Sequence, residues 1–215
     1  MMAPNAPSHP RRRRLDYSLI EGLVPAGARV LDLGCGDGQL LADLAVRKGC
    51  AVRGIEINDE FVRECIAHGV PVFHGDMLEG IAYFRADSFD VVILSQTLQQ
   101  TSDPLRVLHE MLRVGRTGIV SFPNFAYWRI RMQLLLQGRM PHTARLSYEW
   151  YDTPNVHLCT VADFRAACRQ EGLQIGRELF LAPPARRIGP WLSNWRAELA
   201  IFQICAAPGC GPAAT

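Results

Sequence analysis

The stretch VLDLGCGDGQLL, residues 30–41, runs from an apolar segment through three glycines into a second apolar segment. Gly34, Gly36 and Gly38 are spaced two residues apart. Glycine has no Cβ, so it adopts left-handed backbone conformations and lets another molecule approach the main chain closely. A glycine loop between a buried strand and a helix aims backbone N–H groups at a ligand and suits an anion or a carboxylate. The stretch therefore predicts a ligand site where the first strand ends.

The spacing of the glycines distinguishes between classes of ligand. A nicotinamide-binding loop has the pattern G-x-G-x-x-G, whose third glycine would fall at position 39, which is Gln39 here. The pattern in this chain is G-x-G-x-G, and Asp32 lies in the strand just ahead of it. A carboxylate at that place repels a pyrophosphate. The loop therefore favours a ligand with a positive group and a free carboxylate.

The rest of the chain alternates between short apolar runs and amphipathic segments. Asp103 followed by Pro104 predicts the start of a helix, and Thr160 with Asp163 three residues later predicts another. This alternation predicts an α/β protein with a Rossmann-like, doubly wound parallel sheet, whose ligands bind beyond the carboxyl ends of the strands. The core side of the helix after Pro104 should consist of Leu105, Leu108, Met111 and Leu112. Strands are expected at 28–33, 51–57, 70–75, 89–95, 117–122, 173–182 and 198–205.

Acidic residues end the first three predicted strands. Glu56 lies 20 residues after Gly36 (56 − 36), where a carboxylate can accept hydrogen bonds from both hydroxyls of a ribose. Asp76 follows the third strand and can meet an exocyclic amine. A single acid at such a place is as often a helix cap or a surface charge. Capping alone does not explain three acids, Asp32 included, behind one glycine loop.

Together these residues resemble the class I S-adenosylmethionine-dependent methyltransferase fold over residues 15–205. The resemblance implies a seven-stranded sheet with the last strand antiparallel, and S-adenosylmethionine as cofactor. It implies that Gly34, Gly36 and Gly38 face the methionine moiety and that Asp32 lies close to its amino end. It further implies ribose contact by Glu56, adenine contact by Ile57, Asp76 and Met77, and a place beside the sulfonium for Ser95 and Gln96.

Longer runs resemble one family more closely. VLDLGCGDGQLL, SFDVVILSQTLQ, EMLRVGRTGIVSFPNF, WRIRMQLLLQGRMP and YEWYDTPNVHLCTVADF are similar to the methionine biosynthesis protein W family (MetW). This resemblance implies a role in methionine biosynthesis that supports homoserine O-acylation, with a homoserine O-acyltransferase as partner. The alternative is an S-adenosylmethionine-dependent methyltransferase that acts on a small molecule.

Few residues are candidates for direct catalysis. Methyl transfer needs little more than placing a nucleophile in line with an activated methyl group, so a missing base does not exclude it. His157 lies in a loop that should cover the strand ends, which makes it a candidate. His74 and His109 fall in a strand and a helix and are interpreted as structural. The sequence FPNF, residues 122–125, has the wrong order and position for the loop of amino-methylating enzymes.

Aromatic and arginine residues gather in residues 123–158, a predicted helix and loop inserted into the domain. Such residues cage substrates, pack the core of a lid, or form protein interfaces. The sequence leaves these three interpretations open. The predicted partner or lid residues are Tyr127, Trp128, Arg131, Trp150 and Tyr151.

Composition bounds the rest of the prediction. The net charge is only +2, so nothing global indicates nucleic acid or a membrane surface as a partner. The seven cysteines show no C-x-x-C spacing, which argues against a disulfide framework or a metal ribbon and is typical of a reducing compartment. No apolar run follows the arginines at 11–14, so export is not expected and the predicted location is cytoplasmic. The predicted domain spans 15–206 between a Pro/Arg-rich tail, 1–14, and a flexible tail, 207–215.

Overall fold

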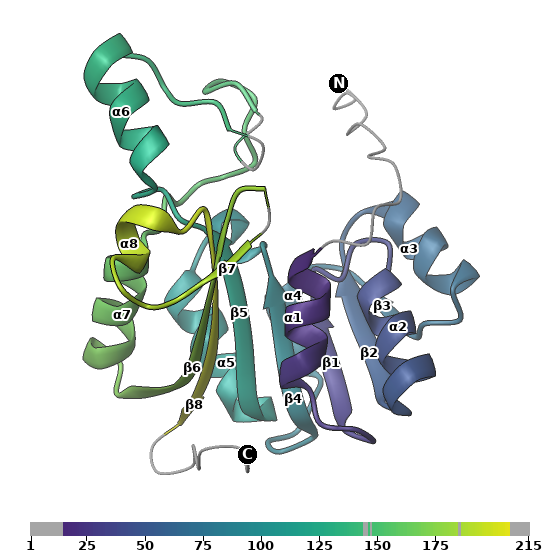
Figure 1. The fold of residues 1–215 in the computed structure, drawn as a ribbon. Helices are drawn as coiled ribbons and strands as arrows, with labels where there is room; N and C mark the ends of the chain where they lie inside the picture. The colour runs from purple at the N-terminus through teal and green to yellow at the C-terminus, as the bar shows by residue number, and fades with distance from the viewer. Residues whose placement is uncertain (1–14, 144–145, 147, 185, 207–215) are drawn as a thin grey trace.

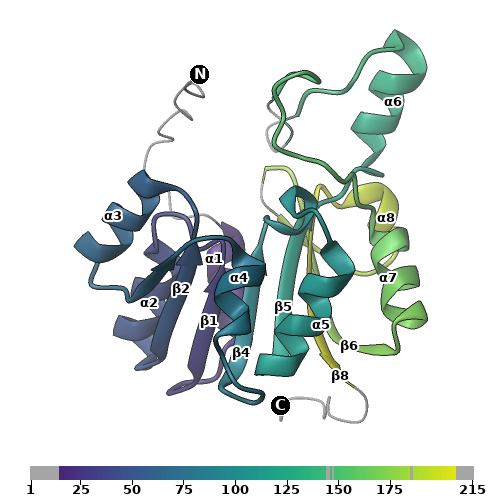
Figure 2. The same ribbon diagram turned by 180° about the vertical axis from the view of Figure 1, so that it is seen from behind.

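The computed structural model describes residues 15–143, 146, 148–184 and 186–206, so both predicted tails lie outside the described residues. Figures 1 and 2 show one central sheet with helices on both faces. In the described part of the chain the strands lie in the order β3-β2-β1-β4-β5-β8-β6-β7. The strands are β1 (Arg29–Leu33), β2 (Ala51–Glu56), β3 (Val72–His74), β4 (Phe89–Ser95), β5 (Gly115–Pro123), β6 (Leu173–Ala182), β7 (Arg186–Ile188) and β8 (Leu199–Ala206). The helices are α1 (Leu15–Leu23), α2 (Gln39–Lys48), α3 (Asp59–Ala67), α4 (Met77–Ala82), α5 (Pro104–Val114), α6 (Trp128–Gln137), α7 (Val161–Gln170) and α8 (Ser193–Arg196), with a 3₁₀ turn η1 (Leu98–Gln100).

The sheet has the topology that the class I methyltransferase fold implies. Strands β1 to β5 are mutually parallel, whereas the last strand, β8, runs antiparallel between β5 and β6. The chain leaves β1 toward β2 and β3 and then crosses back to β4 on the other side of β1. Ligands of doubly wound sheets bind where the strand order reverses in this way. The predicted fold class is confirmed, and β7 is a short addition at the sheet edge.

The central strands are buried on both faces. Val30 of β1 pairs in register with Val91 of β4, and both belong to the core under α1 and α2. The next pair, Leu31 and Val92, belongs to the opposite core under α4 and α5. Side chains of a strand alternate between its faces, so a strand with two cores must be apolar throughout.

Four elements were not expected from the sequence. They are helix α1, the six-residue helix α4, and the strand β7 and helix α8 within the connection before β8. The core side of α5 is also rotated relative to the prediction, because Val107 and Val114 are buried whereas Leu105 is 42% exposed.

Among the described cysteines, Cys205 is disulfide-bonded, so the expectation of unpaired thiols is wrong there. The free thiols are Cys35, Cys50, Cys65, Cys159 and Cys168.

Helix α6 and the segment after it stand away from the sheet, above its carboxyl edge (Figures 1 and 2). Ile130 is the buried residue within α6. The base of the helix is fixed by Asn124, whose side chain is fully buried. Its Nδ2 donates to the carbonyls of Asn194 and Ala197, and its Oδ1 accepts from the N–H groups of Ala126 and Val161. Within the described residues, no helix has both the length and the apolar character needed to cross a bilayer.

Candidate functional site

The glycine loop connects β1 to α2 with three left-handed residues. Gly34, Gly36 and Gly38 have φ values of 68°, 57° and 73°. A Cβ on Gly34 would lie 2.8 Å from Thr97, and one on Gly38 would lie 2.8 Å from Cys65. A Cβ on Gly36 would meet nothing within 4 Å. Packing within the protein therefore requires glycine at positions 34 and 38, whereas Gly36 faces the space where a ligand can approach.

The loop is held by hydrogen bonds to β2. The N–H groups of Gly34 and Cys35 donate to the carbonyl of Ile55 at 2.8 and 3.1 Å. The N–H of Gly36 donates to Glu56 Oε2 at 2.8 Å. The N–H of Gly38 donates to the carbonyl of Cys35. The expectation that these amides point free toward a ligand is therefore wrong for all four, and the open face of the loop is formed by Gly36 itself.

Glu56 links the loop to the beginning of α3. Its carboxylate is 7% exposed and also accepts from the N–H groups of Ile57 and Asn58, both at 2.9 Å. A carboxylate has about four acceptor positions. Three backbone donors therefore leave room for a further hydroxyl donor beside Gly36. Ribose contact by Glu56 stays a prediction that this geometry permits.

Asp76 is the N-cap of α4. Its Oδ1 accepts from the N–H groups of Leu78 at 2.7 Å and Glu79 at 3.4 Å. Asp76 therefore does cap a helix, as the alternative interpretation of the sequence expected. Its carboxylate is also exposed, so it can still reach a ligand, and its contact with an adenine stays a prediction. Ile57 is exposed beside Glu56, whereas Met77 is partly buried and packs against the core.

The end of β4 is strained. Gln96 has φ of 57°, which is unusual for a residue with a side chain. Its N–H donates to the carbonyl and the hydroxyl of Ser121, and Ser95 Oγ lies 3.3 Å from the same hydroxyl. The Gln96 amide donates to the carboxylate of Asp16, a fully buried residue of α1. Sequence reasoning missed Asp16 because it did not predict α1, although the mixed apolar and acidic pattern of LDYSLIEGL could have indicated a helix.

The loop that carries His157 lies over the end of β4. The N–H groups of Val156 and His157 both donate to the carbonyl of Gln99, at 2.8 and 3.0 Å. The Gln99 amide donates to the carbonyl of Gln96, and its Oε1 is buried with no hydrogen-bond partner among the described residues. His157 itself is exposed, and its contact with a substrate stays a prediction.

The other two histidines considered in the sequence make contacts that fit structural roles. His109 Nε2 lies 2.8 Å from Glu171 Oε2, and His74 Nε2 lies 3.2 Å from Asp59 Oδ1. Among the described residues, no group of three or more metal-ligating side chains is assembled.

Two thiols pack behind the glycine loop. Cys35 and Cys65 are buried, and their sulfur atoms lie 3.6 Å apart. Cys65 Sγ donates to the carbonyl of Gly36 at 3.1 Å. Burial raises the pKa of both thiols, and the nearby carboxylates of Asp32 and Glu56 add to this effect. Asp32 is itself 2% exposed, so the face of the loop toward the protein is lined by two thiols and a buried acid.

The predicted partner or lid residues separate into two groups. Tyr127 is 4% exposed and belongs to the core at the base of α6. Arg131 donates to the carbonyl of Ala126 at 2.7 Å, and its guanidinium lies 5.2 Å from the ring centre of Trp195. Trp128 is 38% exposed, whereas Trp150 and Tyr151 are 71% and 70% exposed and contact each other edge to face. The interpretation as core packing therefore holds for Tyr127, whereas the rings of Trp150 and Tyr151 lie at the surface, where another molecule can contact them.

Comparison with known proteins identifies relatives over most of the chain. The family model described as "Methionine biosynthesis protein MetW" matches residues 14–204. The chain is 38% identical over 175 residues to the bifunctional methionine biosynthesis protein MetXA/MetW of Rhodopirellula baltica, covering 77% of this chain and 28% of that protein. It is 37% identical over 110 residues to the ubiquinone biosynthesis O-methyltransferase of Xanthomonas axonopodis pv. citri, covering 49% of this chain and 45% of that protein. The chain thus spans less than half of either relative.

Solved structures share the fold at low sequence identity. An S-adenosylmethionine-dependent methyltransferase of Mesorhizobium loti has a TM-score of 0.62 at 19% identity, covering 88% of this chain and 97% of that chain. The [4+2]-cyclase SpnF has a TM-score of 0.63 at 18% identity, covering 88% and 80%. One architecture thus carries proteins named for different reactions, so the fold alone does not fix methyl transfer.

Proposed function

The chain belongs to the MetW family of methionine biosynthesis proteins, and from this we propose that it binds S-adenosylmethionine and acts as the partner of a homoserine O-acyltransferase. The observation that carries the partner proposal is the exposed apolar surface on α6 and the segment after it. We call this the α6 surface, and its members are Trp128, Leu134, Leu135, Leu136, Met140, Trp150 and Tyr151.

The residues at the strand ends fit the cofactor. Gly36 leaves the loop open to a methionine moiety, and the Glu56 carboxylate beside it has an acceptor position for a ribose hydroxyl. Ile57 offers an exposed apolar side chain to a ring, and Asp76 offers a carboxylate near an exocyclic amine. When bound, the cofactor supplies an activated methyl group on a sulfonium. The protein binds and orients it, and Gln96, fixed by Asp16, lies at the end of the neighbouring strand.

Calorimetric titration with S-adenosylmethionine and with its demethylated product tests cofactor binding. Wild type should bind, and Gly36→Val should abolish binding because its side chain enters the open face of the loop. Gly49→Val is the matched control: Gly49 has φ of 62°, also has open space around its Cβ position, and caps α2 at the end away from the loop. Absence of heat and of a thermal shift with both compounds would remove the cofactor from the proposal.

The α6 surface supports a protein partner. Leu135 and Leu136 are 76% and 74% exposed on a helix with a single buried residue. Exposed apolar side chains that follow one another along a helix and the segment after it, with arginines among them, are typical of protein interfaces. The MetXA/MetW relative carries both names in one longer protein. A covalent link between two modules raises their effective concentration, which is advantageous when the modules act together.

Co-purification with a homoserine O-acyltransferase of the same organism tests the partner. Wild type should co-elute with the acyltransferase and raise its activity or its stability. Leu135→Glu/Leu136→Glu and Trp150→Ala should each weaken the complex, since loss of a buried interface tryptophan costs about 2 kcal/mol, roughly thirtyfold in affinity. Val46→Glu and Tyr83→Ala are matched controls, because these residues are at least as exposed but lie on α2 and next to α4.

A second candidate is methyl transfer to a small molecule, which the strained Gln96 just after β4 and the buried Gln99 of η1 favour. Incubation with S-adenosylmethionine, the acyltransferase and its reactants should release the demethylated product if this candidate is correct. A stable complex without turnover supports the partner proposal. Turnover of S-adenosylmethionine without a complex with the acyltransferase would favour the methyltransferase candidate over the partner proposal.

A further inference from the structure

We propose that Asp16 is a positioning residue through which the docking of α1 sets the geometry of the glycine loop. Figure 1 shows α1 in front of the central strands, with its first turn at the carboxyl edge of the sheet. Asp16 lies in that turn and is fully buried. A buried carboxylate is costly unless hydrogen bonds compensate for its lost hydration. The bond that it accepts from Gln96 joins α1 to the residue that follows β4.

The strained Gln96 is held by three elements. Its N–H donates to the carbonyl of Ser121 in β5 at 2.9 Å, and its carbonyl accepts from Gln99 Nε2 in η1 at 2.8 Å. Its side-chain amide donates to Asp16 in α1. A residue at φ of 57° persists only where its surroundings over-determine that conformation. Of these bonds, the one to Asp16 depends on the docking of α1.

The residue after Gln96 is a wall of the glycine loop. Thr97 Oγ1 donates to the carbonyl of Ser95 at 3.1 Å, which fixes its side chain. Its Cγ2 and Oγ1 lie 2.8 and 2.9 Å from the place that a Cβ on Gly34 would occupy. Because Gln96 directly precedes Thr97, a change in the φ of Gln96 moves Thr97 relative to Gly34. Asp16, Gln96 and Thr97 therefore link α1 to the loop.

The amides of the loop report on this link. The N–H groups of Gly34, Cys35, Gly36 and Gly38 all donate to acceptors of the protein. Amides bonded in this way exchange with solvent when the loop opens locally. Loss of Asp16 should therefore speed their exchange.

A ligand that binds the closed loop should in turn favour docked α1, because coupling between two equilibria is reciprocal. Gly36, whose Cβ position is open, lies two residues after Gly34 and is the place where a ligand can approach. That the ligand is S-adenosylmethionine rests on the proposed function, whereas the contacts from Asp16 to Gly34 do not.

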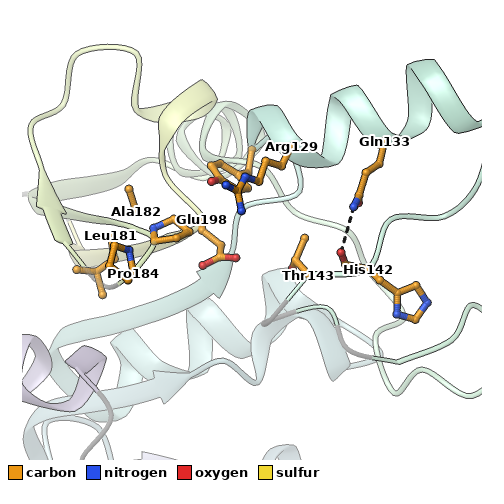
Figure 3. Close-up of a pocket in the computed structure, with 10 residues that line it drawn as sticks. Arg129, Gln133, His142, Thr143, Leu181, Ala182, Pro184 and Glu198 are labelled. Atoms are coloured by element: carbon orange, nitrogen blue, oxygen red, sulfur yellow. Dashed lines mark hydrogen bonds between the residues drawn. The ribbon is translucent and has the colours of Figure 1, made fainter.

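A cavity between α6 and the edge of the sheet provides the control. It has a volume of about 450 Å³, and Figure 3 shows Arg129 and Glu198 among the residues that line it. None of its lining residues belongs to the glycine loop or to the link from α1. Arg129→Met therefore changes a side chain near the same edge of the sheet without touching the link.

Hydrogen exchange of the ligand-free protein tests the positioning role. Asp16→Ala should speed exchange of the loop amides about tenfold, as expected for the loss of a hydrogen bond to a charged group. Asp16→Asn keeps an acceptor oxygen and should speed it less, and Arg129→Met should leave the wild-type rate. The amides of α7 serve as an internal reference for global unfolding. If Asp16→Ala does not fold, Gln96→Ala removes the same bond from its other side and should give the same faster exchange.

Gln96→Gly separates positioning from a general contribution of Asp16 to stability. Glycine adopts a φ of 57° without side-chain strain, so residue 96 then no longer needs the bond from α1. Asp16→Ala should therefore speed loop exchange strongly in the wild-type background and little in the Gln96→Gly background. Equal effects in both backgrounds would mean that Asp16 acts by another route, and would overturn the proposal.

Calorimetric titration with S-adenosylmethionine tests the coupling to a ligand. Asp16→Ala should bind about tenfold more weakly than wild type, because it must re-form the strained turn on binding. In wild type, the ligand should slow exchange of the α1 amides and leave those of α7 unchanged. If wild type does not bind, the proposed function fails, and the exchange of the ligand-free proteins still decides the role of Asp16. If wild type binds and Asp16→Ala binds equally well, the proposed function stands and the positioning role is overturned.

Discussion

The three glycines of the loop meet two different physical demands. Gly34 and Gly38 are glycines because Thr97 and Cys65 occupy the space of their absent side chains. Gly36 has open space instead, and its N–H is tied to Glu56. One short pattern thus encodes both the packing of the loop and its open face, and single substitutions can separate the two.

Gly34→Ala should destabilise the protein through backbone strain and through collision with Thr97. We expect a loss of about 2–4 kcal/mol in the free energy of unfolding, because left-handed strain and overpacking each cost about 1–2 kcal/mol. In the Thr97→Ala background the collision disappears, since the nearest atoms are Cγ2 and Oγ1 of Thr97. Urea denaturation of the four proteins of this double-mutant cycle measures the coupling. Strictly additive losses would mean that the collision is absent.

Cys35 and Cys65 should resist alkylation in the folded protein. Burial raises the pKa of both, so the reactive thiolate forms only at a pH well above that of an exposed cysteine. Burial likewise raises the pKa of Cys168 to about 11 and that of Cys159 to about 12. Peptide mass spectrometry after iodoacetamide treatment at about pH 8 should find these four labelled in urea and unlabelled without it. Rapid labelling of Cys35 in the native protein would contradict this burial.

The stability of a helix depends on contacts at its ends, and in α4 the contact at the N-terminus is made by the N-cap residue Asp76. Asp76→Ala should cost about 1 kcal/mol, because the N–H groups of Leu78 and Glu79 lose their acceptor. Asp76→Asn keeps a capping oxygen and should be nearly neutral in stability. If Asp76 also meets an adenine amine, Asp76→Asn should still weaken cofactor binding. Thermal denaturation and calorimetric titration of both variants separate the two roles.

Strands β1 and β4 are joined at their beginnings by an ion pair. Asp90 accepts from the backbone N–H of Arg29 at 2.9 Å and pairs with its guanidinium at 2.9 Å. These bonds from Arg29 lower the pKa of Asp90 to about 2. Because this pKa lies below the unfolded value of about 4, the stabilisation is present above about pH 4 and is lost as pH falls toward 2.

Thermal melts of wild type and Asp90→Asn between about pH 7 and pH 2 check this linkage. Wild type should have the higher Tm at neutral pH, and the difference should shrink as pH falls. The effect should be small, because both side chains are partly exposed and solvent screens the pair. A difference that grows toward acid pH would have the wrong sign.

In the molecule as a whole, a sheet packed between two cores differs in its resistance to local opening from the projecting helix α6 and the segment after it. Among its described residues, the segment between α6 and α7 makes few backbone hydrogen bonds, and these include the bonds of Val156 and His157 to Gln99. Regions with few buried contacts open at the lowest free-energy cost. Limited proteolysis should therefore cleave within 138–158 first and leave the sheet intact.

Bound acyltransferase should protect this segment, since the partner would cover the α6 surface. The Leu135→Glu/Leu136→Glu variant, mixed with the same acyltransferase, is the control and should be cleaved as fast as the free protein. Initial cleavage within β1 or β4 would contradict the assignment of the weak region.

The sequence alone determined the elements whose signals are local. The strand 89–95 has the predicted bounds, and Asp103 and Thr160 cap α5 and α7 as their spacing predicts. Glu56 was predicted at the end of the second strand and is the last residue of β2. Such patterns can be recognised because backbone conformation, capping and side-chain periodicity act over a few residues.

Only the tertiary structure decided which distant residues meet. The bond between Asp16 and Gln96 spans 80 residues, and the cavity beside α6 brings Arg129 together with Glu198. Tyr127 and Trp150 were both predicted as partner or lid residues, but Tyr127 is buried at the base of α6 while Trp150 is exposed. Burial and pairing of this kind depend on how the sheet, its helices and the projecting segment pack, and no local pattern encodes that packing.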